Sequence, residues 1–327
     1  MVNTDDSRAA KRNTRDLFRR FLRHENGFLV IILVAMIIIM GVITKGLTFS
    51  RDNITNIWLQ SSMRGIAAMG QLFVILTAGI DLSIGGVALT VAVLGAKLMT
   101  GQPDVSAAAI ASMMIVGIGI GAFNGSLVSR IGMPALIVTL GMWQMTKGFS
   151  YLLCRGQTIL NLPPPLNYFG AGIIAGVPVP VIIFISVAVV VYFVLNYTTF
   201  GRSVYAVGGN PVSAWLSGIR VNNILFAVYV VSGFLGALAG FVMMARVMIG
   251  GLTTVVGLEL DAIAAVVIGG VSLMGGRGNV IGAVIGVIIL GVINNGMNVF
   301  AVNPAYQDIV KGAIIIAAVA VDYIRRR

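Results

Sequence analysis

Long apolar runs separated by short polar segments dominate this sequence. A helix that crosses a bilayer needs about 20 predominantly apolar residues, and ten runs come near that length. The chain is therefore predicted to be an all-α membrane protein with about ten transmembrane helices. The runs cover residues 28–44, 64–80, 84–100, 105–128, 134–153, 178–195, 223–245, 262–275, 280–299 and 305–324.

Two places in this pattern predict helices that break inside the membrane. The runs 64–80 and 84–100 are separated by little more than Gly79-Ile80-Asp81-Leu82-Ser83. The run 262–275 is short and ends in Gly275-Gly276-Arg277-Gly278. Irregular backbone at membrane depth is tolerated where it is buried in protein or lines a water-filled cavity. We therefore expect broken or re-entrant segments at both places.

Glycines spaced four residues apart within the runs predict close helix packing. Small residues at this spacing let two helix backbones approach each other in lipid. We therefore expect the spans to form one compact bundle. The pairs are Gly121/Gly125, Gly236/Gly240 and Gly282/Gly286.

Composition supports a membrane location and excludes several kinds of enzyme. Apolar residues make up 58% of the chain and charged residues 10%, against about 25% charged in a soluble domain, and the mean hydropathy is +0.98. With Cys154 and His24 as the single cysteine and histidine, no Cys/His metal cluster, disulfide framework or Ser-His triad can be assembled. The sequence also contains no Gly-x4-Gly-Lys-Ser/Thr phosphate loop. We expect a transport subunit rather than an enzyme, with no catalytic, metal or cofactor-binding residues.

The formal charge of +11 indicates membrane topology rather than nucleic acid binding. Lysine and arginine are concentrated in cytoplasmic loops of membrane proteins, and an even number of spans places both termini on one side. With the termini inside, the basic residues inside are Arg8, Lys11, Arg12, Arg15, Arg19, Arg20, Arg23, Arg130, Arg202, Arg220, Arg277, Arg325, Arg326 and Arg327. Those outside are Lys45, Arg51, Arg64, Arg155 and Arg246, while Lys97, Lys147 and Lys311 lie within runs. This bias predicts that both termini are cytoplasmic.

The predicted organisation is a single transmembrane domain with short basic ends. Residues 1–27 form a basic cytoplasmic N-terminal segment, 28–324 the transmembrane domain, and 325–327 a basic cytoplasmic C-terminus. The longest cytoplasmic loop is 196–222.

Within the loop 196–222 the sequence predicts a short helix over about 211–217. Asn210 is a good N-cap, Pro211 suits the first helical position and Gly218 is a natural C-terminal stop. Such a helix is too short and polar to span. It is either a surface turn helix or a docking element for a cytoplasmic partner.

Three motifs in the same order resemble the permease subunits of ABC sugar importers, in the ribose/galactose/autoinducer-2 branch of the branched-chain amino acid permease superfamily. The loop motif Gly201-x-x-x-Tyr205-Ala206-x-Gly208-Gly209-Asn210, with Ser217-Gly218-Ile219 behind it, is similar to their coupling-helix segment. Residues 79–86 resemble the early motif of that branch, and residues 260–270 with 275–278 its late motif. Relatives usually carry a basic residue where this chain has Trp215.

The resemblance implies a ten-helix ABC importer permease fold in the cytoplasmic (inner or plasma) membrane. It also implies a second permease copy as a homo- or heterodimer, cytoplasmic ABC ATPase subunits that hydrolyse the ATP, and an extracytoplasmic substrate-binding protein. The residues expected to couple the chain to the ATPase are Gly208, Gly209, Asn210, Pro211, Trp215, Leu216 and Gly218.

Polar and aromatic residues within the runs are candidates for the translocation pathway and the helix breaks. Asp81 and Asp261 each open an apolar helix, where a carboxylate satisfies free N–H groups and suits the helix dipole; alternatively they hold broken-helix ends beside the pathway. Amide side chains and aromatic faces suit a sugar, although hydrogen bonding between helices is the alternative role for each. The candidates are Gln71, Asp81, Asn124, Trp143, Asp261, Asn294 and Asn295.

The leading hypothesis is the permease subunit of an ATP-driven importer for a monosaccharide such as ribose. One alternative is an importer of the same class that carries nucleosides or branched-chain amino acids. Others are an ion-coupled secondary transporter, which usually has paired membrane acids and needs no ATPase docking helix, and a channel or structural membrane protein.

The first prediction concerns topology. Because basic residues are concentrated on the side of the termini, reporter fusions at Arg327 and in the loop at Pro163–Pro165 should report opposite sides of the membrane. Finding both fusions on the same side would contradict the ten-span arrangement.

Overall fold

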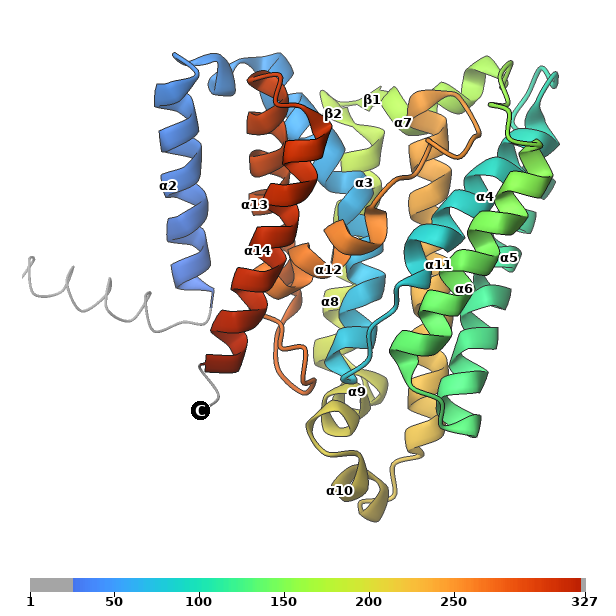
Figure 1. Ribbon diagram of the computed structural model, residues 1–327, viewed down its shortest axis with the longest axis vertical. Helices are drawn as coiled ribbons and strands as arrows, with labels where there is room; N and C mark the ends of the chain where they lie inside the picture. Colours follow the sequence, from blue (N-terminus) through green and yellow to red (C-terminus); the bar gives the residue numbers. More distant parts are fainter. Residues whose placement is uncertain (1–25, 325–327) are drawn as a thin grey trace, which may run out of the picture.

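The computed structural model describes residues 26–324, so most of the predicted N-terminal segment 1–27 and the C-terminal segment 325–327 lie outside the described residues. Within that range the protein is mostly helical, and the long helices run along the longest axis of the molecule (Figure 1). The ten helices that match the predicted runs are α2 (Gly27–Ile43), α3 (Arg51–Leu76), α4 (Ser83–Met99), α5 (Ala107–Ser126), α6 (Ala135–Cys154), α8 (Val179–Tyr197), α11 (Val221–Val247), α12 (Leu258–Ile268), α13 (Val280–Val299) and α14 (Pro304–Ile324).

Four helical segments among the described residues are long and apolar enough to cross a membrane by length and composition. They are Ala107–Ile131, Val179–Tyr197, Val221–Val247 and Val280–Val299. The first combines α5 with the π-helical turn η2 (Leu127–Ile131). These segments are typical of a multi-pass membrane protein.

Shorter elements occupy the two ends of the molecule. At the end where α3 begins lie η1 (Leu47–Phe49), η3 (Pro164–Leu166), α7 (Asn167–Ala171) and an antiparallel hairpin of β1 (Ile173–Ile174) and β2 (Val177–Pro178). At the opposite end, α9 (Thr199–Gly209) and α10 (Pro211–Leu216) project below the long helices (Figure 1).

Polar caps define where several helices begin. The Ser50 hydroxyl accepts a hydrogen bond from the Asn53 amide at the start of α3, and Asn279 accepts one from Gly282 at the start of α13. The Thr198 hydroxyl accepts one from the Gly201 amide at 3.1 Å and starts α9. The loop 196–222 therefore holds, besides the predicted short helix, a second helix that the sequence analysis did not name, which Thr198 caps at its start.

The start of α3 also differs from the sequence prediction. The helix begins at Arg51, more than three turns before residue 64, so Arg64 lies near its middle. The prediction that a span begins at Arg64 is wrong, because the polar first half of α3 continues the same helix. Arg64 is therefore removed from the set of basic residues assigned to outside loops.

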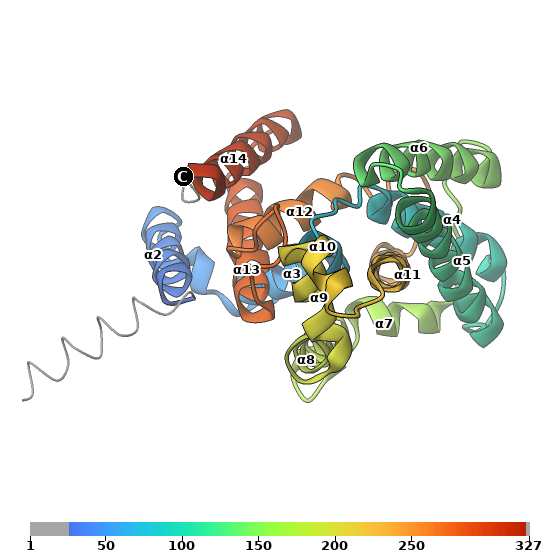
Figure 2. The same cartoon turned by 90° about the horizontal axis from the view of Figure 1, so that it is seen from below.

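The core lies where α11 passes between the early helices, in contact with α3, α4 and α5 (Figure 2). The C-terminal half of α3 is almost wholly buried, with Met69 and Leu72 at 0% exposure. The large side chain of Tyr229 on α11 is 1% exposed. The elements on either side of the first helix break are thus enclosed by protein.

Glycine makes the closest of these helix contacts possible. A Cβ on Gly121 of α5 would collide with the Tyr229 carbonyl oxygen, and one on Gly117 would lie 2.6 Å or less from atoms of α11 that include the Gly233 carbonyl. Gly240 approaches the backbone of Ala88 in the same way. Gly286 approaches the backbone of α12. The predicted packing role of the spaced glycines is confirmed, because in each pair at least one member lies against the backbone of a neighbouring helix.

A matched pair of substitutions on α5 tests this packing. Gly121→Ala should lower the melting temperature of the purified protein in detergent, because the added methyl group meets the Tyr229 carbonyl and overpacking costs about 1–3 kcal/mol. Gly119→Ala, where a Cβ has open space, should be neutral or stabilising by up to about 1 kcal/mol from helix propensity. Equal destabilisation by both substitutions would contradict the close contact.

Candidate functional site

The exposed helix α10 forms the tip of the segment that was predicted to couple the chain to a partner. The Asn210 side-chain oxygen accepts hydrogen bonds from the amides of Val212 and Ser213 at 3.0 Å each, and Pro211 stands at the first position. Gly218 follows the helix with φ +84°. The predicted helix is confirmed and ends at Leu216, one residue early. Its caps define where the helix begins and where it ends.

Two apolar side chains on α10 lie open at this tip. Trp215 is 66% exposed and Leu216 is 73% exposed. Gly209, Asn210, Pro211 and Gly218 are also exposed. This surface is accessible to a partner.

Gly208 differs from the other predicted coupling residues because it is buried at the end of α9. A Cβ there would collide with the Leu76 carbonyl at the end of α3 and would lie 2.7 Å from the Gly276 amide. The Gly276 amide donates to the same Leu76 carbonyl at 2.9 Å, and the Tyr205 hydroxyl donates to the Gly278 carbonyl at 3.0 Å. The coupling segment therefore contacts the end of α3 and the loop after α12 together.

This contact brings the coupling motif and the late motif together at the end of α3, shortly before the early motif begins. We call it the glycine junction, defined by Leu76, Tyr205, Gly208 and Gly275–Gly278. The φ values of Gly275 and Gly276 are +79° and +69°, which only glycine adopts without strain. The end of α9 thus lies against both the segment before the first helix break and the loop that follows α12.

The first helix break is held by a buried polar cluster around Asp81, which is 2% exposed. One carboxylate oxygen accepts from the Ser83 amide at 2.9 Å and from the Ser83 hydroxyl at 2.6 Å. The other accepts from the Ser232 hydroxyl of α11 at 2.7 Å. The prediction that Asp81 satisfies a free N–H at a helix start is confirmed.

The candidates Gln71 and Asn124 belong to the same cluster. Oriented to satisfy both of its polar atoms, the Gln71 amide donates to the Asp81 carbonyl at 3.0 Å and accepts from the Asp81 amide at 3.1 Å. Asn124 of α5 donates to the Ser83 hydroxyl at 2.8 Å. Gln71 and Asn124 are 0% exposed, so this cluster joins α3, α4, α5 and α11 rather than facing an open cavity.

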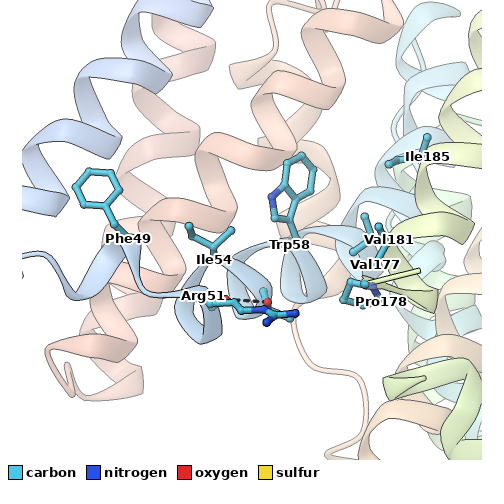
Figure 3. Close-up of a pocket in the computed structure, with 10 residues that line it drawn as sticks. Phe49, Arg51, Ile54, Trp58, Val177, Pro178, Val181 and Ile185 are labelled. Carbon is cyan, nitrogen blue, oxygen red and sulfur yellow. Dashed lines mark hydrogen bonds between the residues drawn. The ribbon is translucent and has the colours of Figure 1, made fainter. Parts of the chain in front are cut away.

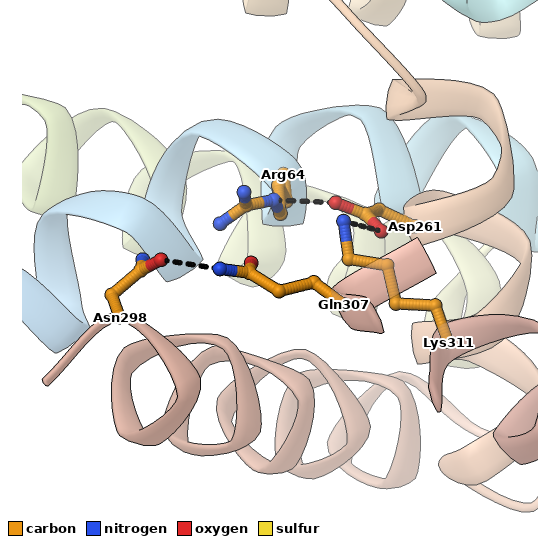
Figure 4. A network of polar contacts seen from close by, with 5 residues as sticks. All are labelled: Arg64, Asp261, Asn298, Gln307 and Lys311. Carbon is orange, nitrogen blue, oxygen red and sulfur yellow. Dashed lines mark hydrogen bonds and ion pairs between the residues drawn. The ribbon is translucent and has the colours of Figure 1, made fainter. Parts of the chain in front are cut away.

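Asp261 does not make the N-terminal cap that was one of the two roles expected for it. The helix α12 begins at Leu258, and the Asp261 carboxylate pairs with the Arg64 Nε at 2.6 Å and with the Lys311 Nζ at 3.3 Å (Figure 4). The prediction that the Asp261 carboxylate caps free N–H groups is therefore wrong. Its partners are two basic side chains, one from α3 and one from α14. Beside it, Asn298 and Gln307 are hydrogen bonded at 3.1 Å (Figure 4).

The two asparagines on α13 differ in their surroundings. Asn295 donates to the Asn53 side chain of α3 at 2.8 Å. Asn294 is 2% exposed, and neither atom of its amide has a hydrogen-bond partner among the described residues. A buried amide without partners is destabilising by about 1–3 kcal/mol, so Asn294 has hydrogen-bonding capacity that this arrangement does not use.

Trp143 lines a small crevice of about 140 Å³ between α4, α6 and the start of α12. The Lys147 Nζ lies 5.1 Å from the centroid of the Trp143 ring, and Glu259 also lines the crevice. Gly85 leaves room for the Glu259 side chain, since a Cβ at residue 85 would collide with the Glu259 carboxylate. An aromatic face, a cation and an anion thus lie around one opening.

Sequence reasoning did not select Arg64, Lys147, Glu259 or Lys311 as site residues. Each is a charged residue within or beside an apolar run, and intramembrane charges are rare and usually functional or paired. That signal marks the residues, but it does not tell which of them meet.

Comparison with known proteins agrees with the three motifs and their order. Residues 53–319 match the family described as the permease component of the branched-chain amino acid transport system. The chain belongs to this family. Together with its apolar helices, membership makes it a multi-pass membrane protein.

Three proteins with similar sequences are named as sugar permeases. The D-allose transport system permease protein of Escherichia coli K12 is 39% identical over 89% of both chains. The ribose import permease protein of Haemophilus influenzae is 38% identical over 93% of this chain and 94% of the other. The fructose import permease protein of Rhizobium meliloti is 37% identical over 90% and 84% respectively. No solved structure matches.

Substitutions of Asp81 test the buried cluster in this permease. Asp81→Ala should lower stability by about 1–3 kcal/mol, because buried hydroxyl and amide donors lose their acceptor. Asp81→Asn should be milder, since one oxygen still accepts from the Ser83 amide. Melting in detergent measures both, with Asp104→Ala in an exposed loop as the control. If Asn is as damaging as Ala, the negative charge itself is required.

Proposed function

We propose that this chain is the permease subunit of an ATP-driven importer and forms the translocation pathway for a monosaccharide. The observation that carries the proposal is 37–39% identity over most of the chain to permeases named for allose, ribose and fructose. The family description names branched-chain amino acids, which keeps an importer for those substrates as the second candidate.

The proposed topology has ten spans with both termini in the cytoplasm. It places α9 and α10 on the cytoplasmic side and the β1–β2 hairpin at the opposite end. A partner ATPase docks on α10 and hydrolyses the ATP, while this chain binds no cofactor and catalyses no reaction. A binding protein delivers the sugar at the end with the hairpin, and a second permease copy completes the transporter.

The glycine junction supports a route from ATP hydrolysis to the pathway. When the ATPase moves α10, the adjoining α9 moves Leu76 and Gly276 with it, because Gly208 packs against both. Leu76 stands shortly before the break at Asp81, and Gly276 follows α12, which carries Glu259 and Asp261. The motion therefore reaches both irregular segments without passing through the lipid-facing helices.

The crevice at Trp143 is the part of the proposed pathway that suits a sugar. The ring offers a face for stacking, and Lys147 and Glu259 supply a donor and an acceptor for hydroxyl groups. The paired Asp261 and the hydrogen-bonded Asp81 favour this reading over a proton-coupled secondary transporter, because Asp261 is held by basic partners and the Asp81 carboxylate is occupied by hydrogen bonds within the bundle.

Docking is tested with two exposed aromatic residues at opposite ends. Trp215→Ala should reduce co-purification of the ATPase, because tryptophan is a frequent anchor of interfaces. Tyr306→Ala, at 65% exposure against 66% for Trp215, is the matched control and should leave co-purification unchanged. Equal binding of the ATPase by both variants would remove α10 as the docking element.

Coupling and substrate are separated in the same assay. Tyr205→Phe removes the hydrogen bond to the Gly278 carbonyl and should lower sugar uptake per ATP hydrolysed while the ATPase still binds.

Uptake is measured in vesicles that hold permease, ATPase and binding protein, with ribose, allose and fructose against leucine. Transport of leucine alone would support the second candidate instead.

A further inference from the structure

A groove of about 550 Å³ lies between α3 and α8 at the end of the molecule opposite α10. Its walls are mostly apolar, with Arg51 at its mouth and Trp58 about two helical turns further along α3 (Figure 3). The proposed function leaves this groove without a role.

The groove is formed by one face of each helix. Arg51, Thr55 and Trp58 lie at intervals of four and three residues on α3, and Val181 and Ile185 are four residues apart on α8, so each set shares one helix face. Seven residues from Arg51 to Trp58 correspond to about 10 Å of depth.

Beyond that depth the two helices close the groove. A Cβ on Gly65 of α3 would collide with the Phe184 ring of α8, so the glycine lets the ring pack directly against the helix. The groove is consequently open at the end near η1 and β2 and shut toward the middle of the bundle.

The mouth carries a positive charge that the rest of the groove does not balance. The Arg51 guanidinium extends across the mouth toward Val177 and Pro178 (Figure 3). Among residues 26–324, the two ion pairs both involve Asp261, with Arg64 and Lys311, so Arg51 takes part in neither. Trp58, about two helical turns further along α3, is half-buried.

We propose that this groove binds one anionic phospholipid, with its phosphate on Arg51 and the upper part of an acyl chain between α3 and α8. Apolar walls suit a hydrocarbon chain, whereas a sugar needs hydrogen-bonding groups along its whole surface. An arginine guanidinium matches a phosphate group with two parallel charge-assisted hydrogen bonds. The proposal rests on the membrane location of the chain and is independent of the transported substrate.

Head-group selectivity tests the proposal. The purified full-length protein in detergent is titrated with phosphatidylglycerol and with phosphatidylcholine, and bound lipid is counted by native mass spectrometry. We expect phosphatidylglycerol to bind in preference, and Arg51→Gln to reduce that preference about fivefold. Lys45→Gln replaces an exposed basic residue outside the groove and should leave it unchanged. An unchanged preference in Arg51→Gln would overturn the assignment.

The position of the acyl chain is tested through Trp58. In a Trp143→Phe/Trp215→Phe background Trp58 is the remaining tryptophan, and phosphatidylglycerol brominated near the head of its chains should quench its fluorescence at low lipid-to-protein ratios. Arg51→Gln should shift this quenching to higher ratios, whereas Lys45→Gln should not. If quenching rises with total lipid in the same way in the background protein, in Arg51→Gln and in Lys45→Gln, Trp58 meets only the surrounding lipid and the groove has no specific site. If Trp58 is instead protected from quenching when the protein dimerises, a second copy of the chain occupies the groove.

Discussion

The break between α3 and α4 exposes backbone polar groups in the interior of the helix bundle, and the Asp81 cluster is what satisfies them. Without water, an unpaired N–H or carbonyl in this setting costs several kcal/mol. Asp81 receives three hydrogen bonds from Ser83 and Ser232, and Gln71 bonds to its backbone on both sides. A helix can therefore stop and restart in the core of this protein because one carboxylate and one amide replace the missing helical hydrogen bonds.

The close helix contacts surround this break and depend on glycine. Gly79 faces the Tyr229 hydroxyl, Gly85 faces Glu259, and Gly86 faces Thr146. The residues on both sides of Asp81 thus bring α4 against α6, α11 and α12. The early motif is at once a turn, a cap and a packing surface, which explains why it alternates apolar residues with the polar Asp81 and Ser83 and ends in two glycines.

The ion pairs of the described residues lie around Asp261 and do not include the Asp81 cluster. Asp261 holds Arg64 and Lys311 together and so ties α3, α12 and α14 (Figure 4). Removing one member of a buried ion pair is strongly destabilising because it leaves an uncompensated charge. The short α12 is therefore anchored at its first turns, while its far end runs into the loop of the glycine junction. The segment from α12 through this loop is thus held by Asp261 at one end and contacted by α9 at the other.

The features that the sequence determined by itself are local ones. Apolar run length predicted every long helix, and Asn210, Pro211 and Gly218 predicted α10, because capping depends on neighbours within a few residues. The cap at Asp81 was predictable for the same reason. The tertiary structure alone decided that Asp261 pairs with Arg64 and Lys311, residues 197 and 50 positions away, and that Gly208 meets Leu76 and Gly276. Hydrophobic periodicity does not encode which helices become neighbours, since lipid and a protein core are equally apolar, so these partners follow only from the packing of the whole bundle.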